Sequence, residues 1–181
     1  FVSLGCDKNL VDTEMMLGVL KGKGYTFTDD EREADVIVVN TCCFIGDAKE
    51  ESIQTLLEMA QLKKTGRLKG LIAAGCLAQR YQKEIGEEIP EVDMLLGTTT
   101  FGEIAEAVDE VLGGGRGSRC RDVREAAVLC GDRVVTTGGH YAYLKIAEGC
   151  GKHCTYCIIP KVRGEYRSVP MEELAAQAEK L

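Results

Sequence analysis

The sequence predicts an α/β fold, with a doubly wound parallel sheet followed by the truncated start of a second domain. Over residues 1–112, short apolar runs alternate with longer segments of helical periodicity. This alternation is typical of a parallel sheet that has helices on both faces. At 181 residues and 45% hydrophobic composition, the chain is large enough to bury a core.

Four strands and four helices are expected in the first 112 residues. The predicted strands are 1–4, 35–39, 71–74 and 94–96. The second of them carries β-branched residues on both faces, as a buried parallel strand does. The predicted helices are 11–23, 49–63, 77–85 and 101–112. The second helix is expected to bury a stripe formed by Ile53, Leu56, Leu57 and Ala60.

A glycine-rich stretch separates this unit from the rest of the chain. Four glycines among residues 113–119 predict a flexible linker, which an irregular or hairpin segment extends to 139. A new strand is expected at 141–146 and a helix at 171–181. Too few residues follow Gly139 for an α/β barrel of roughly 250 residues, so the chain is expected to be a piece of a longer protein.

Composition excludes several classes of protein. No apolar run approaches the roughly 20 residues of a membrane span, and no signal-peptide pattern opens the chain. A net charge of −7 argues against a general nucleic-acid-binding surface. Nine cysteines without a secretion signal indicate a reducing, cytoplasmic location and metal or redox use.

Three of the cysteines form one compact group. Cys150, Cys154 and Cys157 are spaced C-x3-C-x2-C directly after the predicted strand at 141–146. Zinc sites usually have four ligands in two pairs, and here His153 is badly placed to be the fourth. Three thiolates suit a [4Fe–4S] cluster with one open iron. A zinc site and structural thiols are the less favoured alternatives.

Three further cysteines are far apart in sequence but equivalent in topology. Cys6, Cys42 and Cys76 each follow a predicted strand and precede a helix. Because the carboxyl ends of parallel strands meet at one edge of a sheet, these thiols are expected to converge on a second metal site. Gly5 and Gly75 allow tight backbone there. The remaining cysteines, Cys43, Cys120 and Cys130, are expected to be free thiols.

These motifs resemble those of a known enzyme family. Residues 141–157 are similar to the opening of radical S-adenosylmethionine (radical SAM) enzymes. Segments 3–9, 40–42 and 75–80 resemble the three signatures of the methylthiotransferase domain. The chain therefore resembles the amino-terminal part of the radical SAM methylthiotransferases. The resemblance implies a methylthiotransferase domain at 1–112, a linker at 113–139 and the start of the radical SAM domain at 140–181.

The resemblance implies two clusters and their ligands. The auxiliary [4Fe–4S] cluster would be held by Cys6, Cys42 and Cys76. The radical SAM [4Fe–4S] cluster, which binds S-adenosylmethionine, would be held by Cys150, Cys154 and Cys157. Tyr156 would pack near the adenine of that cofactor.

Two subfamilies compete within the resemblance. Residues 6–14 and 157–164 resemble the RimO type, which transfers a methylthio group to the β-carbon of an aspartate in a small-subunit ribosomal protein. An electron donor such as flavodoxin or ferredoxin is implied. The alternatives are a MiaB-type enzyme that modifies a tRNA adenosine, a non-catalytic iron–sulfur module and a zinc-binding α/β domain. The 181 residues alone are expected to be inactive.

The sequence departs from the RimO pattern at two positions. Cys43 stands where glycine is common, and Val169 stands where a second arginine is common.

Polar residues near the cysteines have two possible roles. Asn9, Asn40 and Gln79 are expected either to donate hydrogen bonds near the auxiliary cluster or to cap helices and loops. Four cations form a basic segment that either attracts an anionic ligand or remains solvated: Lys152, Lys161, Arg163 and Arg167.

Overall fold

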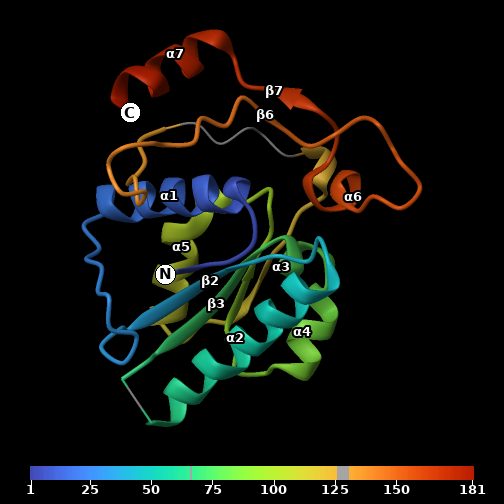
Figure 1. Cartoon of the computed structure of the whole chain (residues 1–181). Coiled ribbons are helices and arrows are strands. Elements are labelled where there is room, and N and C mark those ends of the chain that lie inside the picture. Colours follow the sequence, from blue (N-terminus) through green and yellow to red (C-terminus); the bar gives the residue numbers. More distant parts are fainter. Residues whose placement is uncertain (66, 126–130) are drawn as a thin grey trace.

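A computed structural model describes residues 1–65, 67–125 and 131–181 of the chain. A five-stranded parallel sheet has helices on both faces, and a smaller carboxyl-terminal part lies along one of these helices (Figure 1). The strands follow one another across the sheet in chain order: β1 (Val2–Ser3), β2 (Val36–Thr41), β3 (Gly70–Gly75), β4 (Met94–Leu96) and β5 (Gly117–Arg119). The predicted fold class is confirmed.

Alternate residues of the central strands enter two separate apolar layers. Ile37 and Val39 of β2 pack with one group of helices, whereas Val38 faces the other group. The first layer contains α2 (Gly46–Thr65), α3 (Cys76–Arg80) and α4 (Gln82–Glu88). The second contains α1 (Asp7–Gly22) and α5 (Ile104–Leu112), with the 3-10 turn η1 (Phe101–Glu103) before α5. The period of two along each strand produces this division.

The helices differ from the predicted ones mainly at their ends. α1 begins at Asp7 instead of residue 11, since its first turns bury polar residues that carry no apolar periodicity. The predicted helix at 77–85 is broken at Tyr81 into α3 and α4. The predicted stripe of α2 is half wrong. Leu56 and Ala60 are buried, but Ile53 and Leu57 are 36% and 40% exposed.

The prediction of a flexible linker was wrong for residues 117–119. These residues form β5, in which Gly117 and Arg119 align with Met94 and Leu96 of β4. Gly114 has φ +84°, and Gly115 donates a backbone hydrogen bond to Glu110, so the glycines reverse the chain between α5 and β5. The glycine-rich composition here reflects a tight turn.

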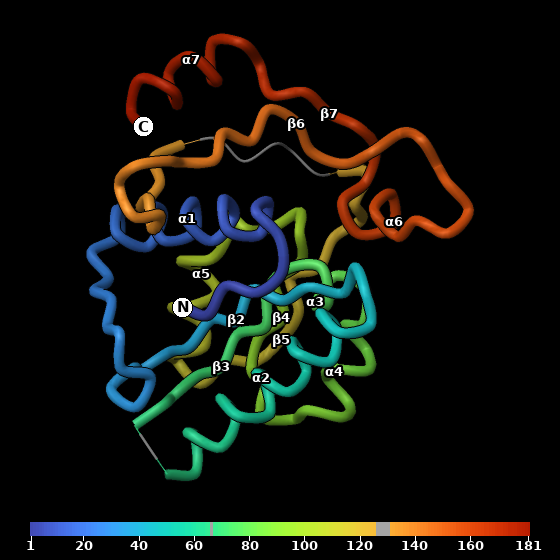
Figure 2. Tube along the Cα trace, viewed as in Figure 1, coloured from blue at the N-terminus to red at the C-terminus, as the bar shows by residue number. Residues whose placement is uncertain are grey.

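The carboxyl-terminal part contains little regular structure. It follows the 3-10 turn η2 (Val123–Glu125) and comprises β6 (Ala147–Glu148), α6 (Ile159–Arg163), β7 (Arg167–Ser168) and α7 (Met171–Lys180). β6 and β7 pair antiparallel, and α7 lies on the outside (Figure 2). The helix predicted at 171–181 is confirmed. The strand predicted at 141–146 is wrong, and no barrel or hairpin forms within the described part of 120–181.

The carboxyl-terminal part crosses α1 at close range. The backbone N–H of Val134 donates to the carbonyl of Glu14 at 3.0 Å, and the Glu14 carboxylate accepts from the N–H of Thr136 at 2.7 Å. One turn further along α1, a Cβ added to Gly18 would overlap the backbone carbonyl of Asp132. Only glycine at this position lets the two backbones approach so closely.

Within the described residues, no helix is both long enough and apolar enough to cross a membrane.

The crossing predicts different effects for two glycines of α1. Gly18→Ala should lower the free energy of unfolding by about 1–2 kcal/mol, because the new methyl group must displace backbone. Gly22→Ala meets no heavy atom within 4 Å and should be neutral or stabilising by up to about 1 kcal/mol. Urea unfolding of the two variants checks this. Equal stabilisation by both substitutions would contradict the close crossing.

Candidate metal centre

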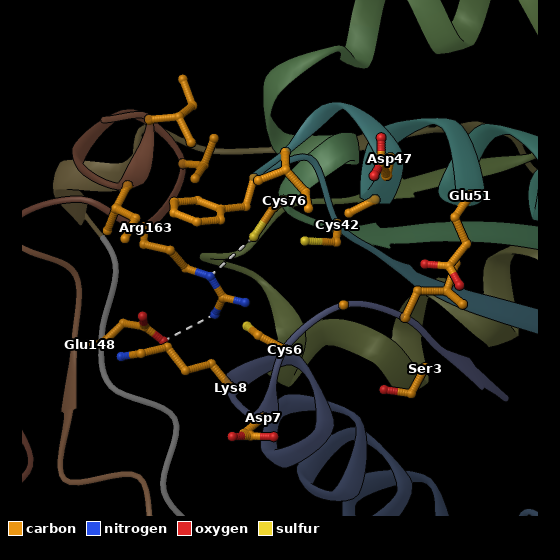
Figure 3. A pocket seen from close by; sticks show the side chains of 18 of the residues that line it. Ser3, Cys6, Asp7, Lys8, Cys42, Asp47, Glu51, Cys76, Glu148 and Arg163 are labelled. Carbon is orange, nitrogen blue, oxygen red and sulfur yellow. Dashed lines mark hydrogen bonds and ion pairs between the residues drawn. The ribbon is translucent and has the colours of Figure 1, made fainter. Parts of the chain in front are cut away.

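Cys6, Cys42 and Cys76 lie around one cavity of about 1070 Å³. Cys6 precedes α1, Cys42 follows the last residue of β2, and Cys76 is the first residue of α3. Because β1, β2 and β3 are neighbours in the sheet, their carboxyl ends bring the three thiols together. Figure 3 shows the three sulfur atoms directed into the same space.

Two glycines make the close approach of these loops possible. Gly5 has φ +89°, and a Cβ there would lie 2.5 Å from Cβ and 2.8 Å from Sγ of Cys42. Gly75 has φ +92°, and a Cβ there would overlap the side-chain oxygen of Asn40. Both positions need a conformation that glycine adopts freely and a space that no side chain can share.

Buried asparagines fix the same loops to one another. Nδ2 of Asn9 donates to the carbonyls of Leu4 at 2.8 Å and Thr41 at 3.0 Å, and so joins the loop of Cys6 to that of Cys42. Asn40 donates to the Asn9 carbonyl at 2.9 Å. Gln79 instead donates to the carbonyl of Arg121, outside the cavity lining.

The three thiols around the cavity can be compared with the needs of a single metal ion and of a cluster. Among the described residues, no three Cys, His, Asp or Glu side chains are arranged to share one ion. In a [4Fe–4S] cluster each thiolate binds a different iron, so the sulfurs need only face a common space. The open cavity between Cys6, Cys42 and Cys76 meets that requirement, and its volume is close to the upper end of the range for ligand pockets.

Burial controls the ionisation of the Cys76 thiol. Burial raises the pKa of Cys76 to about 11, although the nearby guanidinium of Arg163 opposes this rise. Without metal the thiol is therefore protonated at neutral pH. Binding of iron would release this proton, since only the thiolate is a metal ligand.

A cluster of four buried charges lies directly beside Cys76. We call Asp12, Lys145, Glu148 and Arg163 the buried charge cluster; all four are at most 9% exposed. Nη1 of Arg163 donates to Asp12 at 2.5 Å and to Glu148 at 3.1 Å. Lys145 donates to both carboxylates as well, at 3.0 Å to Glu148. Two cations and two anions make the cluster neutral.

The charges of this cluster stabilise one another. Burial raises the pKa of Glu148, but Arg163 and Lys145 outweigh it and hold the pKa at about 2. Burial lowers the pKa of Lys145, but Asp12 and Glu148 outweigh it and raise the pKa above its ordinary value. The Arg163 pKa also lies above its ordinary value, so Glu148, Lys145 and Arg163 are charged at neutral pH.

The buried charge cluster was not predicted from the sequence. The sequence pattern places Arg163 in a basic segment, whereas its side chain is buried. It pairs with Asp12, which lies 151 positions earlier in the sequence. The available signal was Lys145, a lysine inside an apolar run, with Glu148 three residues later. Of the other cations of that segment, Lys152 and Lys161 are exposed and Arg167 is half-buried.

The second group of cysteines lies outside the cavity. Cys150 and Cys157 are half-buried and Cys154 is exposed on the loop between β6 and α6 (Figure 1). The N–H of Cys157 donates to the carbonyl of Cys154 at 3.0 Å, which closes a turn between them. Tyr156 on this turn is 91% exposed, and His153 pairs with Glu165 at 3.0 Å.

The remaining cysteines differ in position. Cys43 is buried, and its thiol donates to the carbonyl of Cys76 at 3.3 Å. Cys120 is half-buried and its thiol donates to the carbonyl of Ala78 at 3.6 Å. Cys130 lies outside the described residues.

Comparison with known proteins assigns the chain to a family. The profile of the family described as uncharacterized protein family UPF0004 matches residues 1–97, more than half of the chain. The chain belongs to this family. The match includes β1 to β4 and all three cysteines around the cavity. The shared UPF0004 region is thus the part that builds the candidate centre.

Curated relatives match almost the whole chain. It is 65% identical to ribosomal protein uS12 methylthiotransferase RimO of Lachnoclostridium phytofermentans, over 98% of this chain and 40% of the relative. Proteins of the same name from Trichlorobacter lovleyi and Pelotomaculum thermopropionicum are 51% and 52% identical, each over 99% of this chain and 40% of the relative. The chain therefore spans about 40% of the length of the curated relatives it matches.

The buried charge cluster predicts a large effect of Asp12. Asp12→Ala leaves two buried cations with one carboxylate and should cost about 3–5 kcal/mol in the free energy of unfolding. Adding Lys145→Met restores neutrality, so the double variant should be more stable than Asp12→Ala alone. Urea unfolding measures both.

An exposed ion pair provides the control for this prediction. Glu87→Gln removes the exposed pair with Lys83, whose atoms are 3.9 Å apart, and should cost less than about 0.5 kcal/mol. Equal costs for Asp12→Ala and Glu87→Gln would contradict the role given to the buried charges.

Proposed function

We propose that this chain is part of a radical SAM methylthiotransferase that modifies an aspartate of a small-subunit ribosomal protein. The observation that carries the proposal is the convergence of Cys6, Cys42 and Cys76 around one cavity. The name of the relatives, ribosomal protein uS12 methylthiotransferase, supports the same reaction and indicates uS12 as the substrate.

The six motif cysteines are the proposed cluster ligands. Cys6, Cys42 and Cys76 would hold an auxiliary [4Fe–4S] cluster in the cavity, and Cys150, Cys154 and Cys157 would hold a second on the exposed loop. Three thiolates leave one iron of the second cluster open for S-adenosylmethionine. When bound, these groups supply the radical chemistry that replacement of an unactivated C–H bond by a C–S bond requires.

The chain's own residues shape the surroundings of the first cluster. Gly5 and Gly75 let the cysteine loops close around it. Apolar side chains contribute to the cavity wall, namely Phe44, Ile45, Ile158 and Ile159. An apolar wall keeps water away from reactive species. Phe44 and Ile45 are still more than half exposed, and in the longer protein we expect the missing barrel to cover them.

Further parts of the proposal depend on the longer protein. Tyr156 would pack on S-adenosylmethionine once the barrel surrounds its loop. A flavodoxin or ferredoxin would supply electrons. The 181 residues alone would bind clusters without turnover, because the match covers only 40% of the length of the relative from Lachnoclostridium phytofermentans. A net charge of −7 disfavours tRNA as the substrate of this part.

Metal analysis tests the cluster assignment. After anaerobic reconstitution, the full-length protein should hold about eight irons with matching sulfide. Replacing Cys150, Cys154 and Cys157 together by alanine should leave about four, and replacing Cys6, Cys42 and Cys76 should also leave about four. Zinc without sulfide would contradict the assignment.

Single variants of the neighbouring cysteines are the controls for the metal analysis. Cys43→Ala and Cys120→Ala should keep about eight irons, because neither thiol is a proposed ligand. Loss of iron from Cys43→Ala alone would show that the ligand set around the cavity has been chosen wrongly.

Mass spectrometry tests the substrate. The full-length enzyme with S-adenosylmethionine and a reductant should replace one hydrogen of an aspartate in ribosomal protein uS12 by a methylthio group. Cys42→Ala should abolish the transfer, whereas Cys120→Ala should not. A methylthio group on tRNA adenosine, with the ribosomal protein unmodified, would contradict the proposed substrate.

A further inference from the structure

Arg163 forms a direct hydrogen bond to one of the proposed cluster ligands. Its Nε donates to Sγ of Cys76 at 3.2 Å, and its side chain is 5% exposed. Figure 3 shows the guanidinium between Cys76 and Glu148. In the described residues, it is the one cationic side chain with a hydrogen bond to Cys6, Cys42 or Cys76.

The guanidinium has no freedom to turn away from the sulfur. Nη1 is held by Asp12 and Glu148, and Nη2 donates to the side-chain oxygen of Asn9. With these nitrogens fixed, Nε keeps its direction toward Cys76. Arginine suits the position because its planar fork makes several directed bonds at once, which lysine cannot.

The backbone also fixes the position of Arg163. It is the last residue of α6, and Gly164 directly after it has φ +77°. A Cβ on Gly164 would lie 2.5 Å from the carbonyl oxygen of Val123. The turn after α6 therefore packs against η2. The backbone of Arg163 is fixed by this turn, and its guanidinium is fixed by Asp12 and Glu148.

We infer that Arg163 is a positioning residue that directs the Cys76 sulfur and raises the reduction potential of the cluster bound there. Reduction adds one negative charge, which a cation hydrogen-bonded to a ligand sulfur stabilises. Such partners of metal ligands are known to tune redox potential. The inference rests on the proposed function, because it requires a cluster on Cys6, Cys42 and Cys76.

The inference links the two groups of cysteines. Arg163 belongs to the segment that directly follows Cys157, yet its side chain contacts Cys76 of the sheet domain. The potential of the first cluster therefore depends on docking of the carboxyl-terminal part.

A redox titration tests the inference on the first cluster alone. The variants are made in the full-length protein in which Cys150, Cys154 and Cys157 are replaced by alanine. Each protein used in the titration must hold about four irons, the content of one cluster. At a fixed applied potential, Arg163→Gln should raise the ratio of oxidised to reduced cluster about tenfold. This corresponds to a fall of about 59 mV in the one-electron reduction potential of the cluster. Arg163→Lys, which keeps the charge but not the directed bond, should give a smaller fall.

Arg133 provides the matched control. Its side chain is also 5% exposed and pairs with a buried carboxylate of α1, Glu14, at 3.4 Å. It has no hydrogen bond to sulfur among the described contacts. Arg133→Gln should leave the potential unchanged. An equal fall in the reduction potential in Arg133→Gln and Arg163→Gln would overturn the inference, because the loss of any buried cation would then be enough to lower the potential.

A spectroscopic measurement covers the case in which Arg163→Gln does not retain its cluster. In the same background with nitrogen-15 arginine, pulsed EPR of the reduced cluster should show a nitrogen coupling that Arg133→Gln keeps and Arg163→Lys loses. If Arg163→Gln holds four irons and its potential is unchanged, this inference alone is overturned. The same holds if the background protein holds four irons and shows no arginine coupling. Absence of iron from the background protein would overturn the proposed function together with it.

Discussion

The ion pairs of the buried charge cluster hold the two parts of the chain together. Asp12 belongs to α1 of the sheet domain, whereas Lys145, Glu148 and Arg163 belong to the carboxyl-terminal part. Each charge is buried and paired, so removal of any one would leave an uncompensated charge in the interior. Glu148 lies before Cys150 and Arg163 lies after Cys157, so their buried ion pair holds the two ends of the second cysteine segment together. It also places a guanidinium beside Cys76.

The sheet topology creates the cavity at which the two parts meet. β1, β2 and β3 are parallel neighbours, so the residues after them lie at one edge. Cys6, Cys42 and Cys76 occupy equivalent places after these strands, and glycines before two of them remove the side chains that would fill the gap. Thiols separated by more than thirty residues in sequence can thus serve one site. The fold supplies their proximity, and the local motifs supply the chemistry.

The sequence predicted the α/β class from the alternation of strands and helices, and the grouping of Cys6, Cys42 and Cys76 from their positions after the predicted strands. It missed β5, because glycines that reverse the chain after α5 have the composition of a linker. It wrongly expected a strand at 141–146, where Lys145 instead reaches Asp12 of α1. Long-range ion pairs leave no periodic pattern in sequence. The burial of Arg163 could therefore be found only from the structure.

The central claim is that three cysteines, each of which follows one of three neighbouring strands, hold one iron–sulfur cluster. Diffraction from crystals of the reconstituted full-length protein at the iron absorption edge tests it most directly. We expect anomalous density for a four-iron cluster inside the cavity, bonded to the sulfurs of Cys6, Cys42 and Cys76. A cavity without iron, or iron bonded to Cys43 in place of one of these three, would contradict it.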